Sequence, residues 1–166
     1  MSEKQDKKSD DKQFILGVGV TSTPMSSVLG KIDDFCRSSL KKPALVVTVN
    51  PEFVMLAQDD SEFKKILNEA DLAIADGVGL RLAGVRQIVP GRVVVEEIVK
   101  KYKVFYLGSL VAKEMADKFG GGYDGGERDI RNPVINDAIV TKINRYKPDV
   151  LLVAYGAPWQ EKWLWS

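Results

Sequence analysis

The stretch that decides the fold runs from Val46 to Gly79, VVTVNPEFVMLAQDDSEFKKILNEADLAIADGVG. It contains two apolar, strand-like runs, at 44–49 and 72–75, joined by segments whose apolar residues recur at helical spacing. Each run stops at a polar residue, where a parallel strand is expected to end. The pattern therefore places Thr48, Asn50 and Asp76 at one edge of a sheet, and open α/β sheets bind their ligands at that edge.

Two later apolar runs end in the same manner. KVFYLGS ends at Gly108, where the absence of a side chain lets a ligand approach the start of the following helix. VLLVAYGAPWQEKW leads into Gly156, Pro158, Gln160 and Glu161. If these strands are parallel neighbours of the first pair, all the polar ends face one crevice. The expected fold class is α/β, with a mostly parallel sheet flanked by helices in a single domain.

The rest of the chain fits around this sheet. Residues 1–13 are almost all charged or polar and are expected to form a disordered tail, so the domain is predicted to span 14–166. Residues 14–20 are predicted to be one short strand, 91–92 a loop, and 94–101 a helix. The Gly-rich segment 120–133 is predicted to be a loop, either a mobile lid or an ordinary connection.

Composition excludes several functional classes. The 166 residues carry a net charge of only +1, so no broad basic field indicates a nucleic-acid partner. Because the chain has no histidine, Ser-His-Asp and Cys-His nucleophiles and imidazole metal sites are excluded. The single cysteine, Cys36, favours a reducing, intracellular setting. No apolar run is long enough to span a bilayer and the N-terminus does not resemble a signal peptide, so a soluble or peripheral protein is expected.

Three residues have both a chemical and a structural interpretation. Asp76 can act as a general base, bind a metal or hold a ribose, or it can simply belong to an Asp-Gly turn. Asn50 can bind a phosphate or a sugar hydroxyl, or cap the helix that follows it. Arg92 can clamp a diphosphate, or it can be a surface arginine at the start of a helix.

Five motifs occur in this order: T-x-N-P-E-x-V at 48–54, A-D-G-x-G at 75–79, G-R-V at 91–93, Y-L-G at 106–108 and G-A-P-x-Q-E-K-W at 156–163. In order and spacing the chain resembles the WecG/TagA/CpsF glycosyltransferases over residues 14–165. The resemblance implies a Rossmann-like enzyme that moves N-acetylmannosamine or a related sugar from a UDP donor. The acceptor is a sugar linked to undecaprenyl diphosphate, in teichoic acid, common antigen or capsule assembly.

The resemblance also implies roles for particular residues. Asp76 matches the general base, Thr48 and Asn50 line its pocket, and Gln160 contacts donor or acceptor. Arg92 matches an arginine of the family, and Gly77 and Gly108 are expected to let the backbone approach the substrate. No divalent metal or other cofactor is expected, and no D-x-D motif is present. The implied location is the cytoplasm, with peripheral attachment to the inner face of the membrane.

The sequence departs from the family pattern in three places. Val95 and Glu97 stand where the G-R-V element usually continues with glycine and aspartate, and the loop 120–126 replaces a strand. The family also continues past Q-E-K-W into an Arg-rich appendage. Without it, the chain is expected to complete its site with a neighbour, to bind without turnover, or to be an artificially shortened form.

The C-terminal tryptophans, Trp159, Trp163 and Trp165, are either an apolar surface for a homo-oligomer or lipid, or part of the core. The main alternative function is a nucleotide-sugar-binding protein of the same fold without turnover. A Rossmann oxidoreductase is disfavoured because the full glycine fingerprint is missing, and the G-V-G at 17–19 is expected to form a structural turn instead.

Overall fold

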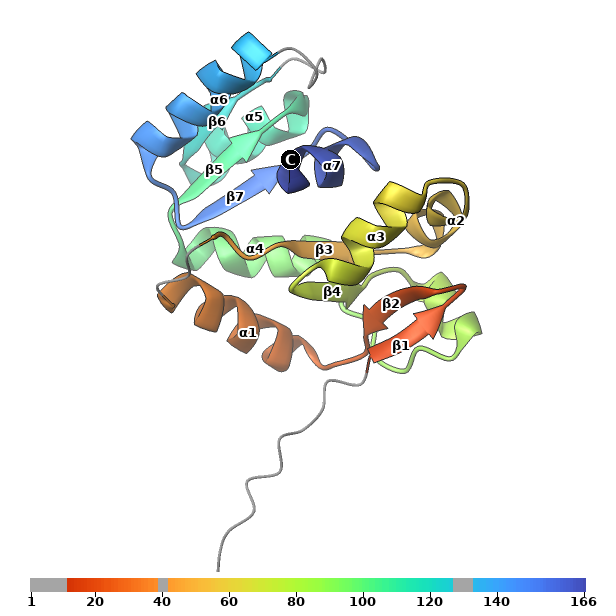
Figure 1. Ribbon diagram of the computed structural model, residues 1–166. Coiled ribbons are helices and arrows are strands. Elements are labelled where there is room, and N and C mark those ends of the chain that lie inside the picture. The colour runs from red at the N-terminus through yellow and green to blue at the C-terminus, as the bar shows by residue number, and fades with distance from the viewer. Residues whose placement is uncertain (1–11, 39–41, 127–132) are drawn as a thin grey trace, which may run out of the picture.

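The structure, a computed structural model, describes residues 12–38, 42–126 and 133–166 (Figure 1). In chain order the elements are β1 (Lys12–Ile15), β2 (Val18–Thr21), α1 (Met25–Arg37), β3 (Val46–Val49), α2 (Pro51–Asp59), α3 (Ser61–Glu69), β4 (Leu72–Ala75), the 3₁₀ helix η1 (Val78–Ala83), α4 (Gly91–Lys101), β5 (Val104–Leu107), α5 (Ser109–Phe119), β6 (Gly122–Asp124), α6 (Pro133–Tyr146), β7 (Val150–Val153) and α7 (Trp159–Trp165). This is the expected α/β, Rossmann-like class, with parallel strands flanked by helices.

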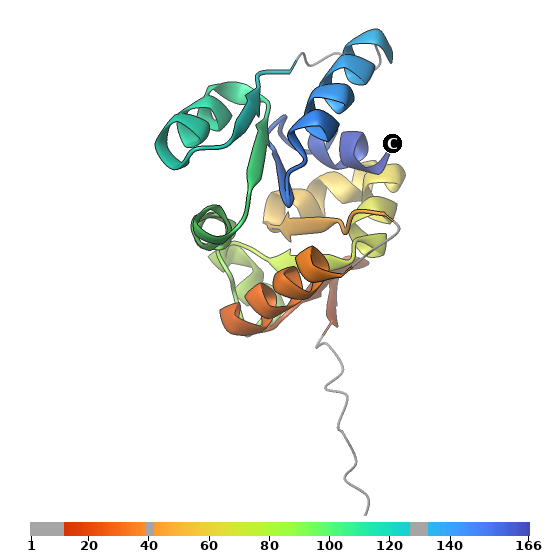
Figure 2. The same ribbon diagram turned by 90° about the vertical axis from the view of Figure 1, so that its left-hand side faces the viewer.

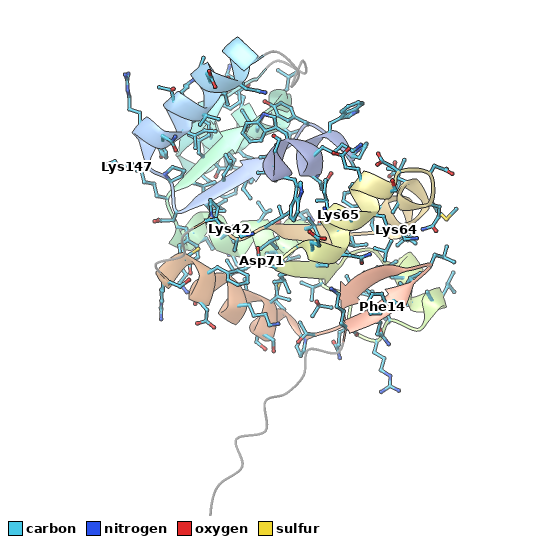
Figure 3. The ribbon with its side chains drawn as sticks, viewed as in Figure 1. Phe14, Lys42, Lys64, Lys65, Asp71 and Lys147 are labelled. Atoms are coloured by element: carbon cyan, nitrogen blue, oxygen red, sulfur yellow. The ribbon has the colours of Figure 1, made fainter. Side chains whose placement is uncertain are left out.

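The first sheet contains the stretch that decides the fold. Its strand order is β1-β2-β4-β3, and β3 and β4 pair in parallel from Val46 opposite Leu72 to Val49 opposite Ala75. Asp71, between α3 and β4 (Figure 3), accepts a hydrogen bond from the Leu45 N–H at 2.8 Å and so ties the start of one strand to the other. The predicted β–α–β unit is confirmed, and its two strands end side by side.

The N-terminal part of this sheet differs from the prediction. The single strand expected over 14–20 is a β1–β2 hairpin that reverses at Leu16 and Gly17, both with positive φ (48° and 81°). Gly17 belongs to the G-V-G at 17–19, which was expected to form a structural turn, but Leu16 carries no turn signal, so 14–20 was still predicted to be one strand. Lys12 and Gln13, assigned to the tail, belong to β1 and pair with Thr21 and Val20. Residues 1–11 lie outside the described residues.

The second sheet has the order β6-β5-β7 and is parallel throughout. Strand β6 lies inside the segment predicted to be a loop, so that prediction is wrong at 122–124. The strand has only three residues and begins with a glycine that fits under the rings of Phe105 and Tyr146, which leaves no apolar periodicity to detect. The lid interpretation covered 120–133, and residues 127–132 of that segment lie outside the described residues.

The sequence predicted one continuous sheet, but the strands form two separate sheets. The two sheets nevertheless share one core. Leu72 and Ile74 of β4 belong to the same buried cluster as Val104 and Tyr106 of β5. Helices α1 and α4 also contribute to this cluster (Figures 1 and 2). A second cluster, built from β2, β3, β4, α2 and α3, fills the first half of the molecule. The shared cluster makes the chain a single domain.

The last helix connects the second sheet to the first half of the molecule. Both views show α7 beside α3 (Figures 1 and 2). The Lys162 Nζ lies 2.7 Å from a carboxylate oxygen of Asp60 and 2.8 Å from one of Glu62, at the start of α3. Ala157, just before α7, packs against the cluster that contains Val49 and Ala75. The segment after β7 therefore packs against the half of the molecule that contains β3 and β4.

Candidate functional site

The carboxyl ends of β3 and β4 bring two of the predicted polar turns into contact. The backbone N–H of Asp76 donates to the Val49 carbonyl at 2.8 Å. Gly77 and Gly79 pack against the Asn50–Pro51 turn, and a Cβ on Gly79 would lie only 2.8 Å from the Pro51 Cγ. Gly79 is therefore needed for the close approach of these two turns, whereas Gly77 is needed for its positive φ of 89°.

Helix α4 begins beside the Asp76 carboxylate. The Val89 N–H donates to the Ala75 carbonyl at 2.9 Å, which carries the following residues along the end of β4. A Cβ on the buried Gly91 would lie 2.9 Å from the Thr48 Cγ2 and 3.0 Å from the Asp76 Oδ2. Gly91 and Arg92, predicted to be a loop, form the first turn of α4 instead. The positive end of this helix dipole therefore lies next to Asp76 and Thr48.

Asn50 is the N-cap of α2. Its Oδ1 accepts a hydrogen bond from the Phe53 N–H at 2.9 Å, and Pro51 follows in the first helical turn. The capping interpretation is thus confirmed. The cap uses only the amide oxygen of Asn50, so the Asn50 Nδ2 group remains as a donor for a ligand.

Arg92 points into solvent. Its side chain is 79% exposed, and its Nη1 lies 2.7 Å from the Glu96 Oε1, one turn along α4. Arg92 therefore lies as expected for a surface arginine at the start of a helix. The position of Arg92 in the first turn of α4 still places its backbone next to Gly91 and Asp76.

Gly108 and Gln160 lie at the carboxyl edge of the second sheet. Gly108 has φ 87°, and a Cβ there would lie 2.9 Å from the Tyr155 ring, so packing requires the glycine. The Gly108 N–H donates to the Asp124 carbonyl at 2.9 Å. Gln160 lies in the first turn of α7 and bonds to its own neighbours, Gly156 and Glu161. The predicted site residues thus form two groups linked by α7. The first group, Thr48, Asn50 and Asp76, lies at the end of the first sheet, and the second group, Gly108 and Gln160, lies at the end of the second sheet.

The second group contains ionisable residues that sequence reasoning missed. The Asp124 carboxylate lies 2.6 Å from the Lys142 Nζ and accepts from the Gly126 N–H at 2.9 Å. Burial acts to raise the pKa of Asp124, but these two partners outweigh it and hold the pKa below its ordinary value. Burial, reinforced by the Asp124 charge, raises the pKa of Tyr155. Asp124 follows no apolar run, so the sequence offered no signal for it.

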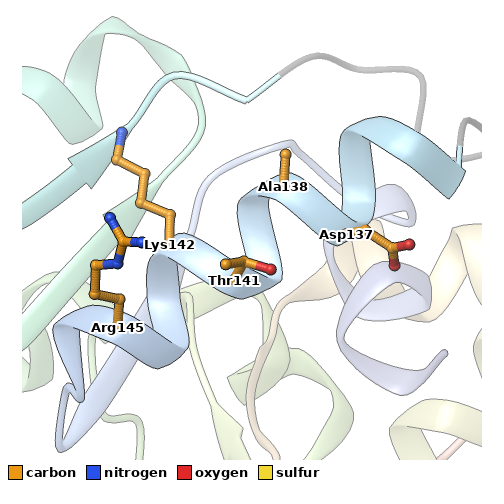
Figure 4. Close-up of a pocket in the computed structure, with 5 residues that line it drawn as sticks. All are labelled: Asp137, Ala138, Thr141, Lys142 and Arg145. Carbon is orange, nitrogen blue, oxygen red and sulfur yellow. The ribbon is translucent and has the colours of Figure 1, made fainter.

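A surface depression of about 410 Å³ lies on α6 (Figure 4), and Lys142, which pairs with Asp124, forms part of its wall. Its described lining residues are Asp137, Ala138, Thr141, Lys142 and Arg145. All five come from one helix, and none is a predicted site residue. A depression with a single helical wall lacks the converging groups that fix a ligand, so we place the site at the sheet edges.

Two further features of the described residues bear on the site. Within residues 12–38, 42–126 and 133–166, no group of three or more His, Cys, Asp or Glu side chains is placed to hold a metal ion. In the same part of the chain, no helix is long and apolar enough to cross a membrane.

Comparison with known proteins gives a consistent result. The sequence profile of the Glycosyl transferase WecG/TagA/CpsF family matches residues 13–166. The chain is 26% identical, over 180 residues, to the N-acetylglucosaminyldiphosphoundecaprenol N-acetyl-beta-D-mannosaminyltransferase of Staphylococcus aureus strain NCTC 8325 / PS 47. The match covers 96% of this chain and 69% of the relative, and the enzymes of strains COL and MRSA252 match equally well. Because the profile match extends over almost the whole chain, the protein belongs to the WecG/TagA/CpsF family of glycosyltransferases.

Proposed function

We propose that the protein is a hexosyltransferase that moves N-acetylmannosamine, or a related sugar, from UDP to N-acetylglucosamine linked to undecaprenyl diphosphate. The proposal rests on one observation: the Asp76 carboxylate and Thr48 both lie against Gly91 in the first turn of α4. Family membership and the names of the relatives support the two sugars and the lipid carrier. The product belongs to cell-wall or surface polysaccharide synthesis.

In the proposed reaction Asp76 is the general base. The acceptor hydroxyl oxygen forms a bond to the anomeric carbon of the donor sugar, and the hydroxyl proton passes to the Asp76 carboxylate. The bond from that carbon to the β-phosphate oxygen breaks, and its electron pair leaves with UDP. A single displacement inverts the anomeric carbon. Backbone N–H groups at the starts of helices and arginine side chains stabilise the charge on UDP, without a divalent metal or another cofactor.

The proposed partners follow from these substrates. The donor is a free nucleotide sugar, whereas the acceptor is held in a lipid bilayer, so the protein works in the cytoplasm at the inner face of the membrane. Arg92 reaches the donor diphosphate only if its guanidinium leaves Glu96. Trp159 and Trp165, 55% and 38% exposed, remain available for lipid or for a second copy in a homo-oligomer. Trp163 is used internally, because its ring packs on Tyr155 and its Nε1 donates to the Asn136 Oδ1 at 3.0 Å.

The test is acceptor-dependent release of UDP from UDP-N-acetylmannosamine, with a lipid-diphosphate N-acetylglucosamine analogue as acceptor. We expect Asp76→Asn to reduce turnover by about a hundredfold or more, as loss of a general base does, with donor affinity within a few fold. Asp59→Asn, the same chemical change at an exposed position at the end of α2, is the matched control. Unchanged turnover in Asp76→Asn would remove the general-base role, and loss of turnover on adding EDTA would contradict metal independence.

The alternative, a nucleotide-sugar-binding protein without turnover, is favoured by one observation. The Arg92 guanidinium is paired with Glu96 in solvent instead of lying in a pocket. The same assay separates the two functions, since both predict that the donor binds and only a transferase releases UDP when acceptor is added. Donor binding without acceptor-dependent release would select the alternative.

A further inference from the structure

Glu161 is the buried ionisable residue that the proposed chemistry leaves unused. Its side chain is 3% exposed, and it is the one buried charged residue in the described part of the chain. The Oε1 accepts a hydrogen bond from the Gln160 Nε2 at 2.7 Å, whereas the inaccessible Oε2 has no hydrogen-bond partner among the described residues. Burial raises the pKa of this carboxyl. The neighbouring Lys162 does not neutralise it, because its Nζ pairs with Asp60 and Glu62.

Such an arrangement is unfavourable for folding. A buried carboxyl group loses its hydration, and no described cation compensates the loss. An apolar or amide side chain of similar size would avoid the cost of the charge. Glu161 therefore calls for an explanation other than stability of the helix.

The described contacts of Glu161 lead to Gln160. The Gln160 Oε1 accepts a hydrogen bond from the Gly156 N–H at 3.2 Å, and its Nε2 donates to Glu161. A backbone N–H can only donate, so the end of the Gln160 amide that faces Gly156 is the oxygen and the end that faces Glu161 is the nitrogen. One N–H of the Gln160 amide remains free of these two bonds. A side chain that is held in place before binding loses less entropy when a ligand arrives.

The location of this pair is consistent with a role at the site. Ala157, four residues before Glu161, packs against the cluster that contains the last residues of β3 and β4. The ion pairs of Lys162 hold the next residue of α7 against the start of α3. Gln160 is therefore presented from the carboxyl end of β7 on a helix fixed to the half of the molecule that carries Asp76.

We infer that Glu161 is a positioning residue that orients the Gln160 amide, so that its remaining N–H donates to an oxygen of the sugar substrate. This inference rests on the proposed function for the contact between Gln160 and substrate. It assigns Glu161 a part in binding a hydroxyl or phosphate oxygen, without direct contact between Glu161 and the reacting atoms.

The first test compares stability with activity in Glu161→Gln. The variant keeps the size of the side chain and removes the charge, but its amide can offer Gln160 either an oxygen or a nitrogen. We expect the Tm at pH 7 to be unchanged or higher and kcat/KM to fall about tenfold or more. Glu114→Gln, an exposed change on α5, is the control for loss of one negative charge. Activity within twofold of the parent would overturn the inference.

A double-mutant cycle then asks whether Glu161 acts through Gln160. If it does, Glu161→Gln has little further effect once Gln160→Ala has removed the amide, with a change in kcat/KM of less than about threefold. Fully additive losses would show that Glu161 acts elsewhere and would overturn the inference. Glu161→Met, which has no buried polar oxygen, is the second variant. If both Glu161→Gln and Glu161→Met fail to fold, Glu161 supports the core and the inference is wrong.

A measurement that needs no activity separates this inference from the proposed function. The two side-chain amide protons of Gln160 are observed by ¹⁵N NMR of the full chain without substrate. In the parent we expect well-separated, sharp signals for a fixed amide, and in Glu161→Gln merged or broadened signals. Unchanged signals in the variant would overturn the positioning role even if the parent is an active transferase. If the signals change in Glu161→Gln but the parent releases no UDP, the positioning role stands and the transferase is rejected.

Discussion

Asn50 shows how a single residue can serve both the fold and the site. Its Oδ1 caps α2, while its neighbour Pro51 packs against Gly77 and Gly79. The sequence alone left capping and ligand binding as alternatives, because an Asn-Pro pair after a strand is typical of both. The structure makes them compatible, since the cap uses the oxygen of the amide and a ligand would use the nitrogen.

A substitution that keeps the cap and removes the amide separates the two roles of Asn50. Serine caps helices as well as asparagine does, so Asn50→Ser should retain stability within a few tenths of a kcal/mol, whereas Asn50→Ala should lose about 1 kcal/mol. If the Nδ2 group binds substrate, both variants should lose about tenfold or more in kcat/KM. Thermal unfolding and the UDP-release assay measure the two quantities. Full activity in Asn50→Ser would leave Asn50 with the cap alone.

At the scale of elements, the sequence predicted those that bury a long or periodic apolar face. The runs that became β3, β4, β5 and β7 are continuous and apolar, and each was located correctly. Two elements were missed for physical reasons. The β1–β2 hairpin turns at Leu16 and Gly17, and a single glycine after an apolar residue does not distinguish a turn from a continuous strand. Strand β6 consists of a glycine, a tyrosine and an aspartate. The direction of the Arg92 side chain was also undetermined, because an exposed arginine takes whichever partner lies in reach.

Helix α7 offers a pH-dependent test at this scale. Its Lys162 lowers the pKa of Asp60 by a hydrogen bond, and the Phe63 N–H adds to the effect. A lowered folded-state pKa means that the stabilisation is present above the ordinary value of 3.8 and is lost as the pH falls through the folded-state value. The raised pKa of Lys162 maintains the pair up to alkaline pH.

We therefore expect Lys162→Met to lower the free energy of unfolding by about 1 kcal/mol at pH 7, as a partly exposed ion pair does. The difference from the parent should shrink towards zero as the pH falls below 3.8. Chemical unfolding at a series of pH values measures it. Lys65→Met is the matched control, because Lys65 is an exposed lysine on α3 itself (Figure 3). A difference between Lys162→Met and the parent that does not depend on pH would show that the ion pairs do not hold α7.

At the scale of the whole molecule, the shared core decides whether the two sheets unfold together. Ile74 of β4 and Tyr106 of β5, 1% and 2% exposed, belong to one cluster with residues of α1 and α4. The sequence predicted the strands but not their division into two sheets, because apolar runs record burial and not the identity of the neighbouring strand. The shared cluster means that each sheet loses part of its core when the other is lost.

Ile74→Ala tests this coupling. Removing a buried isoleucine side chain should cost about 2–5 kcal/mol, and two-state unfolding spreads that loss over the whole chain. All three tryptophans lie at 159–165, in α7, after the last strand of the chain. Their fluorescence therefore reports α7, whereas far-UV circular dichroism reports all helices. We expect both signals to shift to the same lower denaturant midpoint, with Met55→Ala, an exposed change on α2, as the unshifted control. A fluorescence midpoint that stays in place while the dichroism splits into two steps would mean that the second sheet folds without the first. The relative position of the Asp76 group and the Gln160 group would then depend on docking of two independent units.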